Sequence, residues 1–255
     1  MEAYLYQEMF ELERTHWWFA AKHRIVLEVL RRFAPPESAG AARRQIADIG
    51  CGCGRMLELM ANSYDAVGMD ASPIAVEFSR QRGVKVVEGK LPDPLGLPEH
   101  SFDAVTMLDV LEHLDDDVAC ARSVARLLKP QGILLLTVPA HQWLFGPHDT
   151  AHHHRRRYSR WQLRQVLQQA GLHVRFVTYC NTILFPLALA QRAAALLASG
   201  NQAPATVIPA KPINALFRSI FSAERHLIGR VPMPWGLSLL AVATPDEAPA
   251  TPIGG

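Results

Sequence analysis

Short apolar runs alternate with amphipathic stretches through most of this chain, which indicates strands separated by helices. The strands predicted on this basis cover residues 45–50, 65–70, 84–89, 102–109, 133–140, 172–180 and 236–244. The helices predicted between them cover residues 55–63, 72–83, 115–128 and 159–171. Because this order needs right-handed crossover connections, the pattern predicts an α/β fold with a parallel sheet and helices on both faces.

Residues 1–40 carry a different pattern and are predicted to form a helical extension ahead of the sheet. Apolar residues recur at helical spacing over residues 4–33, and Pro35 with Pro36 then ends the helix. One histidine and two tryptophans at positions 16–18 interrupt this pattern.

Capping residues mark two of the later helices. Ser72 is the expected N-cap of one helix and Gly83 its C-terminal glycine. Ser159 and Gln162 fit a capping box at the start of another helix.

The sheet domain is expected to span residues 41–244. A helical insertion at about 181–235 separates the last two strands, and the Pro- and Ala-rich tail at 245–255 is predicted to be disordered.

Composition narrows the class of protein. The 255 residues carry a formal net charge of +2, with 49% hydrophobic and 20% charged residues, a balance typical of a globular protein that does not bind nucleic acid. Acidic residues stand where a secretory signal needs a basic start, and no uninterrupted apolar run reaches the ~18 residues that span a bilayer. Four cysteines in a chain of this length do not make a disulfide framework. We therefore expect a cytoplasmic protein.

The run DIGCGCG at 48–54 lies between a predicted strand and a predicted helix. In an open α/β sheet ligands bind at this turn, because glycines let the backbone approach them closely. A dinucleotide site requires G-x-G-x-x-G, but counting from Gly50 or Gly52 puts Arg55 or Leu57 in the third glycine position. The sequence also has no P-loop motif. The spacing therefore excludes both common nucleotide sites.

The acid-x-G-x-G-x-G spacing resembles the first motif of class I methyltransferases, whose cofactor is S-adenosylmethionine and whose product is S-adenosylhomocysteine. The segments 68–70, 101–117 and 126–139 are similar to later motifs of that family, in the same order. The resemblance implies a Rossmann-like, doubly wound, seven-stranded sheet with an antiparallel last strand. The flanking sequences resemble a bacterial subgroup found among envelope-polysaccharide and secondary-metabolite enzymes.

That resemblance also assigns the cofactor site. Asp70 is expected to accept both ribose hydroxyls, and Asp48 to meet the ammonium of the methionine moiety, directly or through water, unless it only orients loop amides. The run EGKL at 88–91 departs from the family, because many relatives place an aspartate there for the adenine. The cofactor residues expected around the sheet are Asp48, Gly50, Cys51, Gly52, Asp70, Ala71, Gly89, Lys90, Leu91, Leu108 and Asp109.

The helical extension is predicted to close over the cofactor as a lid. Two adjacent tryptophans cannot both face the core of one helix, so Trp17 and Trp18 are expected to cover the site together with His16. We assign Trp18 and Arg24 to the cofactor, with Arg24 or Lys22 meeting its carboxylate, and we assign His16 and Trp17 to the substrate. The alternative is a hydrophobic seam that packs this helix on the sheet.

Methyl transfer is an in-line displacement, so the protein chiefly aligns the acceptor and excludes water, and an oxygen acceptor also needs a base. His113 and His154 are the candidate bases. In the alternative interpretation, His113 bonds a backbone carbonyl and the other histidines belong to a solvated loop. His152, Arg157 and Tyr158 are candidate acceptor-binding residues, because arginine forks match acidic or phosphorylated groups.

No metal is expected. Cys51 and Cys53 fill variable positions of the glycine loop as small residues, and C-x-C alone is a weak zinc signal. Glu112 and His113 resemble the position where some quinone O-methyltransferases hold Mg²⁺, but magnesium prefers oxygen-rich sites.

The sequence leaves two functions open. The first is O-methylation of a small-molecule, glycan or lipid-linked acceptor. The second is a catalytically inactive sensor that binds S-adenosylmethionine, or a structural partner of an active methyltransferase. The Leu- and Ala-rich segment 182–198 is expected to cover one edge of the sheet, to shape the acceptor pocket or to touch a membrane surface. The sequence does not give an oligomeric state.

Overall fold

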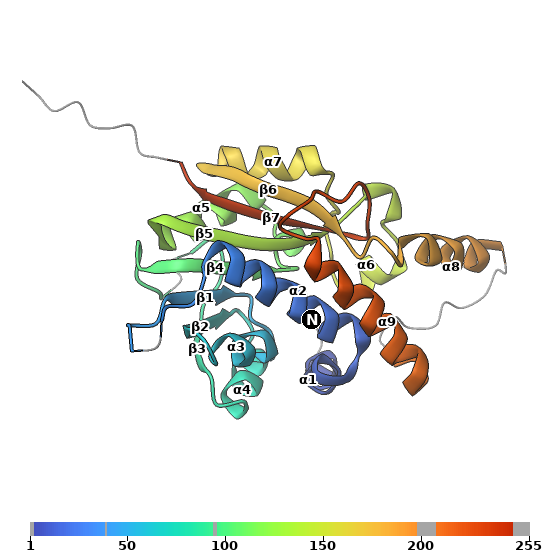
Figure 1. Cartoon of the computed structure of the whole chain (residues 1–255), viewed down its shortest axis with the longest axis horizontal. Helices are drawn as coiled ribbons and strands as arrows, with labels where there is room; N and C mark the ends of the chain where they lie inside the picture. Colours follow the sequence, from blue (N-terminus) through green and yellow to red (C-terminus); the bar gives the residue numbers. More distant parts are fainter. Residues whose placement is uncertain (1–2, 39, 94–95, 198–207, 247–255) are drawn as a thin grey trace, which may run out of the picture.

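The computed structural model describes residues 3–38, 40–93, 96–197 and 208–246, which form one twisted sheet with helices packed around it (Figure 1). The strands in these ranges are β1 (Gln45–Ile49), β2 (Asp65–Asp70), β3 (Lys85–Glu88), β4 (Phe102–Leu108), β5 (Leu128–Pro139), β6 (Leu172–Cys180) and β7 (Ser238–Pro245). Their order in the sheet is β3-β2-β1-β4-β5-β7-β6. β7 is antiparallel to both of its neighbours and the other pairings are parallel. The predicted fold class is confirmed.

The helices in the described ranges are α1 (Ala3–Thr15), α2 (Trp17–Phe33), α3 (Arg55–Met60), α4 (Pro73–Gln81), α5 (Asp117–Leu127), α6 (Pro147–Ala151), α7 (Arg160–Gln169), α8 (Phe185–Leu197) and α9 (Lys211–Ala223), with the short 3₁₀ turns η1 (Leu111–His113), η2 (Gln142–Leu144) and η3 (Glu224–His226). Successive residues of β5 face opposite sides. Leu134 and Leu136 pack with α5 and α7, whereas Ile133 and Leu135 pack with α2 and α3. A strand that is apolar on both faces therefore explains why helices cover both faces of the sheet.

The helical extension is two helices rather than the single helix that the periodicity predicts. His16 leaves the helical conformation, with φ −69° and ψ 132°, and its Nδ1 accepts from the Trp18 N–H at 3.3 Å. It is therefore the N-cap of α2. α2 ends at Phe33, two residues before Pro35, as predicted.

The predicted caps are present. The Ser72 hydroxyl accepts from the Ala75 N–H at 3.4 Å, and Gly83 follows α4 with φ +76°. Ser159 and Gln162 form the reciprocal capping box of α7, with distances of 3.2 and 2.9 Å.

The insertion at 181–235 holds α8 and α9, and its two ends are tied together. The buried Glu224 carboxylate accepts from three consecutive backbone amides at 181–183, at 2.8, 2.7 and 2.9 Å. Cys180 pairs with Ser238, so the chain leaves the sheet and rejoins it at neighbouring positions.

The predicted tail begins two residues too early. Pro245 is the last residue of β7, and the Asp246 N–H donates to the Gly171 carbonyl at 3.0 Å. The remainder of that prediction, 247–255, lies outside the described residues. Within the described ranges, no helix combines the length and the apolar character needed to span a bilayer.

Candidate functional site

The glycine loop joins β1 to α3 at the carboxyl end of the sheet. It lies beside the boundary between β1 and β4, where the order of successive strands changes direction across the sheet. Gly50 has φ +71°, and a Cβ there would lie 2.4 Å from Val110 Cγ2. Gly54 has φ +78°, and a Cβ there would lie 2.6 Å from the Ser79 hydroxyl of α4. Gly50 is therefore needed where the loop approaches the turn after β4, and Gly54 where α4 packs on the loop.

Asp70 lies at the end of β2, facing this loop. Its two oxygens accept from the Gly52 N–H and the Ser72 N–H, each at 2.9 Å. Burial raises the pKa of Asp70, and these amide donors oppose that effect. Each carboxylate oxygen can accept more than one hydrogen bond, so both can still meet the ribose hydroxyls.

Asp48 is buried one residue before the end of β1. The Thr106 hydroxyl donates to its Oδ1 at 2.5 Å. Burial raises the pKa of Asp48 to about 7, and Thr106 opposes this shift. The hydrogen-bond partner found in the described structure is thus a side chain of β4, not a loop amide.

Asp109 follows β4 with φ +56° and meets Lys22 of α2 in an ion pair. The Thr137 hydroxyl donates to the other carboxylate oxygen at 2.9 Å. Burial by itself raises the pKa of Asp109, but the opposing effects, chiefly those of Lys22 and Thr137, together outweigh it and the pKa is lowered. Of the two predicted cations, Lys22 points to the site and Arg24 is exposed, because residues two apart lie on opposite sides of a helix. The assignment of Arg24 to the cofactor does not fit the structure.

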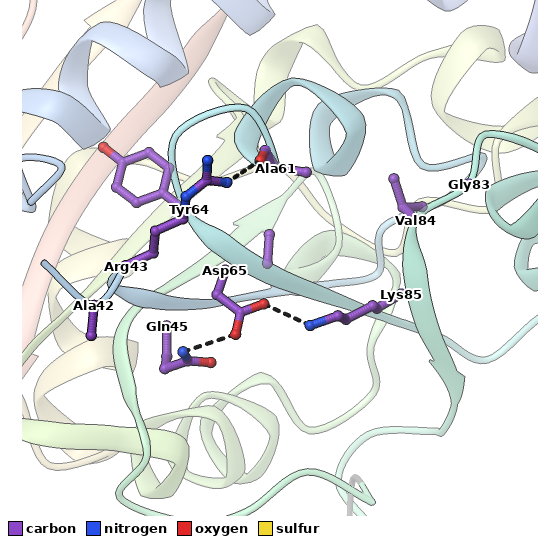
Figure 2. A pocket seen from close by; sticks show the side chains of 10 residues that line it. Ala42, Arg43, Gln45, Ala61, Tyr64, Asp65, Gly83, Val84 and Lys85 are labelled. Carbon is purple, nitrogen blue, oxygen red and sulfur yellow. Dashed lines mark hydrogen bonds and ion pairs between the residues drawn. The ribbon is translucent and has the colours of Figure 1, made fainter. Parts of the chain in front are cut away.

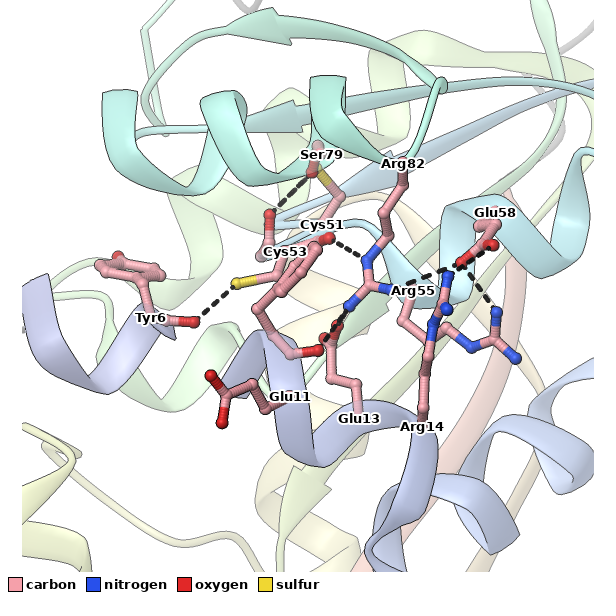
Figure 3. Close-up of polar contacts among 12 residues, drawn as sticks. Tyr6, Glu11, Glu13, Arg14, Cys51, Cys53, Arg55, Glu58, Ser79 and Arg82 are labelled. Carbon is pink, nitrogen blue, oxygen red and sulfur yellow. Dashed lines mark hydrogen bonds and ion pairs between the residues drawn. The ribbon is translucent and has the colours of Figure 1, made fainter. Parts of the chain in front are cut away.

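α1 packs directly on the glycine loop (Figure 3). The Cys53 thiol donates to the Tyr6 carbonyl at 3.3 Å. Arg82, whose side chain is 1% exposed, donates from Nε to the Cys53 carbonyl at 2.7 Å and from Nη2 to the Phe10 carbonyl at 2.9 Å and Glu13 at 3.0 Å. The sequence offered no signal for this clamp, because an arginine before the glycine that ends a helix is usually solvated.

Replacing Arg82 with methionine is expected to lower the free energy of unfolding by about 3–5 kcal/mol, because Glu13 would remain buried without its partner. Burial already raises the pKa of Glu13 to about 7 against the opposing effect of Arg82. Urea denaturation followed by circular dichroism measures the loss. The double variant Arg82→Met/Glu13→Leu should recover part of it, and Arg80→Met, exposed on the same helix, should change little. Equal losses for Arg80→Met and Arg82→Met would contradict the clamp.

The aromatic residues of α2 are packed rather than free to act as a lid. The Trp17 ring lies 5.5 Å from Phe217 of α9, and both Trp17 and Trp18 pack against the same hydrophobic cluster. His16 is buried as the N-cap described above. The break at His16 explains how adjacent tryptophans reach one core, and it favours the hydrophobic seam over substrate binding for His16 and Trp17. Trp18 still lies near the cofactor end, with Lys22 Nζ 4.8 Å above its ring.

Four histidines, which we call the histidine cluster, gather beyond β4. Ring centroids lie 4.7 Å apart for the pair His113 and His154, 4.4 Å for His148 and His152, and 6.0 Å for His152 and His154. The side chain of His154 is only 12% exposed, so the solvated-loop interpretation does not apply to it. His148 was not singled out from the sequence, because a lone histidine four residues before the others carries no signal without the fold.

Two members of the histidine cluster are uncharged near neutral pH. Burial, followed by repulsion from His154, lowers the pKa of His113 to about 4. Burial and His152 likewise lower the pKa of His148 to about 4. A histidine with so low a pKa is a weak base, which argues against His113 as the base.

His154 is held by a buried carboxylate. Its Nδ1 lies 2.9 Å from Asp149 Oδ1, and Arg157 donates to the two oxygens of Asp149 at 2.8 and 3.0 Å. Burial by itself raises the pKa of Asp149, but the hydrogen bonds from His154 and Arg157 outweigh it and hold the pKa well below its usual range. Because an ionised carboxylate only accepts, Nδ1 carries the proton and Nε2 of His154 is left to accept one.

Arg157 and Tyr158 are occupied by the protein itself. Arg157 is buried on Asp149, and its Nη1 also donates to the Ala140 carbonyl at 3.2 Å. The Tyr158 hydroxyl donates to Asp117 at 2.9 Å and is buried. A substrate-binding role for either side chain does not fit this geometry. His152 remains a candidate, since it lies half-buried beside His154.

Glu112, His113 and His154 each present one ligand atom, and these atoms lie within 4.8 Å of one another. Both oxygens of the fully buried Glu112 lack a hydrogen-bond partner. Burial and nearby Asp109 raise the pKa of Glu112 well above its usual value. One carboxyl with two histidines is a ligand set poor in oxygen, which a magnesium ion does not favour. The expectation of no metal stays a prediction.

The two cysteines of the glycine loop, Cys51 and Cys53, contact different parts of the protein. Cys51 Sγ lies 3.9 Å from the Ser79 hydroxyl, and a Cβ on Gly68 would lie 2.7 Å from that sulfur. Cys53 bonds α1 instead. Neither belongs to a metal-type cluster found in the described part of the chain.

The remaining cofactor residues line the same end of the sheet. The Gly89 N–H donates to the Asp70 carbonyl at 3.0 Å, Ala71 and Lys90 are exposed, and Leu91 is buried. Leu108 packs against the cluster that holds α2. Their contacts with adenine or ribose stay predictions.

Two cavities differ in their position relative to this site. The larger, of about 500 Å³, is lined by Gln45, Asp65 and Lys85 at the amino ends of β1, β2 and β3 (Figure 2). The other, of about 330 Å³, borders the site, because Arg157 and Tyr158 are among its lining residues. Ligands of open α/β sheets bind at the carboxyl ends of the strands, so the larger cavity lies at the wrong end of the sheet for the cofactor.

The sheet order and the glycine loop at its switch point define a class I methyltransferase fold. Residues 18–177 match the family model described as a methyltransferase domain, and the chain therefore belongs to this family. It is 32% identical over 167 residues to a probable S-adenosylmethionine-dependent methyltransferase of Mycobacterium tuberculosis, covering 63% of this chain and 57% of that protein. It is 36% identical over 107 residues to a ubiquinone biosynthesis O-methyltransferase of Xanthomonas oryzae pv. oryzae, covering 38% of this chain and 43% of that protein.

A solved TehB-like SAM-dependent methyltransferase from Corynebacterium glutamicum shares the fold. The two chains superpose with a TM-score of 0.54 at 16% identity, covering 87% of this chain and 88% of that one. The predicted family and cofactor agree with these relatives. The chain spans only about half the length of the curated relatives it matches.

Proposed function

We propose that this chain transfers a methyl group from S-adenosylmethionine to a hydroxyl oxygen of a small-molecule, glycan or lipid-linked acceptor. The observation that carries the proposal is the hydrogen bond between Asp149 and His154, which supports His154 Nε2 as the base. The His154 ring lies 4.7 Å from that of His113, which follows Asp109 by four residues beyond the end of β4. The likeness to an O-methyltransferase of ubiquinone biosynthesis supports oxygen as the methylated atom.

The residues present fit the cofactor. Asp70 offers two carboxylate oxygens to the ribose, and the ion pair of Lys22 with Asp109 offers one charge of each sign to the methionine ammonium and carboxylate. S-adenosylmethionine supplies a methyl group already activated by its sulfonium.

The protein must remove the proton of the acceptor hydroxyl. Nε2 of His154 accepts it as the acceptor oxygen forms its bond to the methyl carbon and the carbon–sulfur bond breaks. The resulting imidazolium is stabilised by the ionised Asp149. The electron pair of the broken bond stays on sulfur, so charge and atoms balance.

Two measurements test the proposal. Calorimetry should detect binding of S-adenosylmethionine and S-adenosylhomocysteine. Methyl-labelled S-adenosylmethionine should then label at least one member of a panel of phenols, hydroxylated sugars and lipid-linked sugars, and a saturating amount of EDTA should leave the rate unchanged. Binding without transfer to any acceptor would favour the inactive sensor or structural partner. Absence of binding would contradict both functions.

A further inference from the structure

Large apolar side chains are exposed around the start of α8. Trp143 of η2 is 66% exposed, Ile183 52%, Leu187 43% and Trp235 50%. We call these four residues the tryptophan patch. Soluble proteins rarely leave several such side chains uncovered in one place unless the surface binds something.

Contacts between their neighbours bring the members of the tryptophan patch together. The His141 ring lies 5.5 Å from the ring of Trp143 and 5.5 Å from that of Phe185, the first residue of α8. The Thr182 hydroxyl, next to Ile183 in the chain, donates to the Trp235 carbonyl at 2.6 Å. The patch is therefore one surface built from η2, the start of α8 and the turn before β7.

α8 itself extends away from the sheet, and α9 extends from the same side of the molecule (Figure 1). Among the described side chains of α8, Leu187, Ala190, Ala193 and Ala194 are exposed. The helix is predominantly apolar without being covered by another described element. Exposed apolar surface of this kind marks an interaction site.

The insertion carries a net positive charge. Between Thr182 and Trp235 the sequence has five of the chain's 26 Lys and Arg residues but only one of its 24 Asp and Glu residues. That one acid, Glu224, is buried and bonded to three backbone amides. The rest of the chain has more acids than bases, so the positive charge of the sequence is concentrated in the insertion, which contributes three of the four residues of the tryptophan patch.

We propose that the tryptophan patch docks this protein on an anionic lipid bilayer. Tryptophan rings favour the boundary between headgroups and acyl chains, and the cations of the insertion meet the anionic headgroups. The inference is independent of methyl transfer. The docking also bears on how an acceptor reaches His154, because Arg192 of α8 donates to the Leu144 carbonyl at 2.5 Å. α8 is thus joined to the stretch that leads into α6 and His154.

Vesicle cosedimentation tests the docking directly. Vesicles of phosphatidylcholine mixed with phosphatidylglycerol should pellet the protein, and vesicles of phosphatidylcholine alone should pellet less. The double variant Trp143→Ser/Ile183→Ser should bind the anionic vesicles about tenfold more weakly or worse. Ile74→Ser removes a 40% exposed isoleucine from α4, remote from the tryptophan patch, and should bind as the parent does.

A second arm tests charge. Lys211→Glu/Arg230→Glu, at two exposed positions of the insertion, should lose the preference for anionic vesicles. Unchanged binding of S-adenosylmethionine shows that each variant folds. The proposal is overturned if the parent ignores both vesicle types, or if Ile74→Ser weakens binding as much as the double variant. It is also overturned if sedimentation shows the patch buried between two copies of the chain.

Discussion

Replacing His154 with glutamine is expected to lower kcat by about 10²–10⁴-fold while leaving the affinity for S-adenosylmethionine unchanged. Glutamine keeps a polar side chain of similar length but cannot take up a proton. The histidine is held by Asp149 through Nδ1, so the substitution removes Nε2, the atom that would accept the proton. The measurement is the rate of S-adenosylhomocysteine formation with the best acceptor of the panel, alongside calorimetry of cofactor binding.

A matched pair of variants separates catalysis from folding. His153→Asn changes the exposed neighbour of His154, at a left-handed position (φ +57°) that asparagine tolerates. It should retain full activity. Asp149→Asn should lower kcat about as far as His154→Gln, since an amide can donate to Nδ1 and leave the proton on Nε2, which then cannot act as the base. If His154→Gln turns over at the parent rate, His154 is not the base, and His113→Gln becomes the next test.

Replacing Asp70 with alanine is expected to weaken S-adenosylmethionine binding by about 100-fold or more. The variant loses two hydrogen bonds from ribose hydroxyls to a charged acceptor, each worth about 1.5–3 kcal/mol. It also releases the Gly52 and Ser72 amides, which Asp70 holds at the mouth of the glycine loop. Calorimetric titration with S-adenosylmethionine measures the change.

The other end of the same strand provides the control. Asp65 begins β2 and pairs with the exposed Lys85 at 2.8 Å. Asp65→Ala removes the same carboxylate at the amino end of the strand, where no cofactor is expected, and should bind S-adenosylmethionine as the parent does. Equal effects of the two substitutions would show that the ribose site has been misplaced.

The strands and glycine loop of the sheet could be predicted because the sequence patterns that specify them are local. The apolar run that became β5 has to be covered on both faces wherever it lies, and the glycines at 50 and 54 are required by backbone conformation and close approach. The antiparallel last strand came from the resemblance rather than from the pattern.

The contents of the site were harder to predict, because they depend on which residues meet in space. His154 is one of three consecutive histidines, and its hydrogen bond to Asp149 and its burial, which only the fold creates, distinguish it from the exposed His153. Arg157 reads as a ligand for an acidic acceptor until that same buried carboxylate is found beside it. Arg82 binds two carbonyls and a glutamate from distant segments, a set of contacts that no spacing encodes.

The tie made by Glu224 has a consequence for how this scaffold diversifies. Since Cys180 and Ser238 are paired neighbours, the excursion between them begins and ends at the same place in the sheet. Glu224 holds the first residues of that excursion, and the hydrogen bond from the Thr182 hydroxyl to the Trp235 carbonyl joins its two ends, so its length and surface can change at small entropic cost without altering the registers of β6 and β7. We therefore expect that this segment can be replaced by the corresponding segment of a relative, provided that the glutamate is kept. The same sheet and cofactor site would then serve a different acceptor or surface.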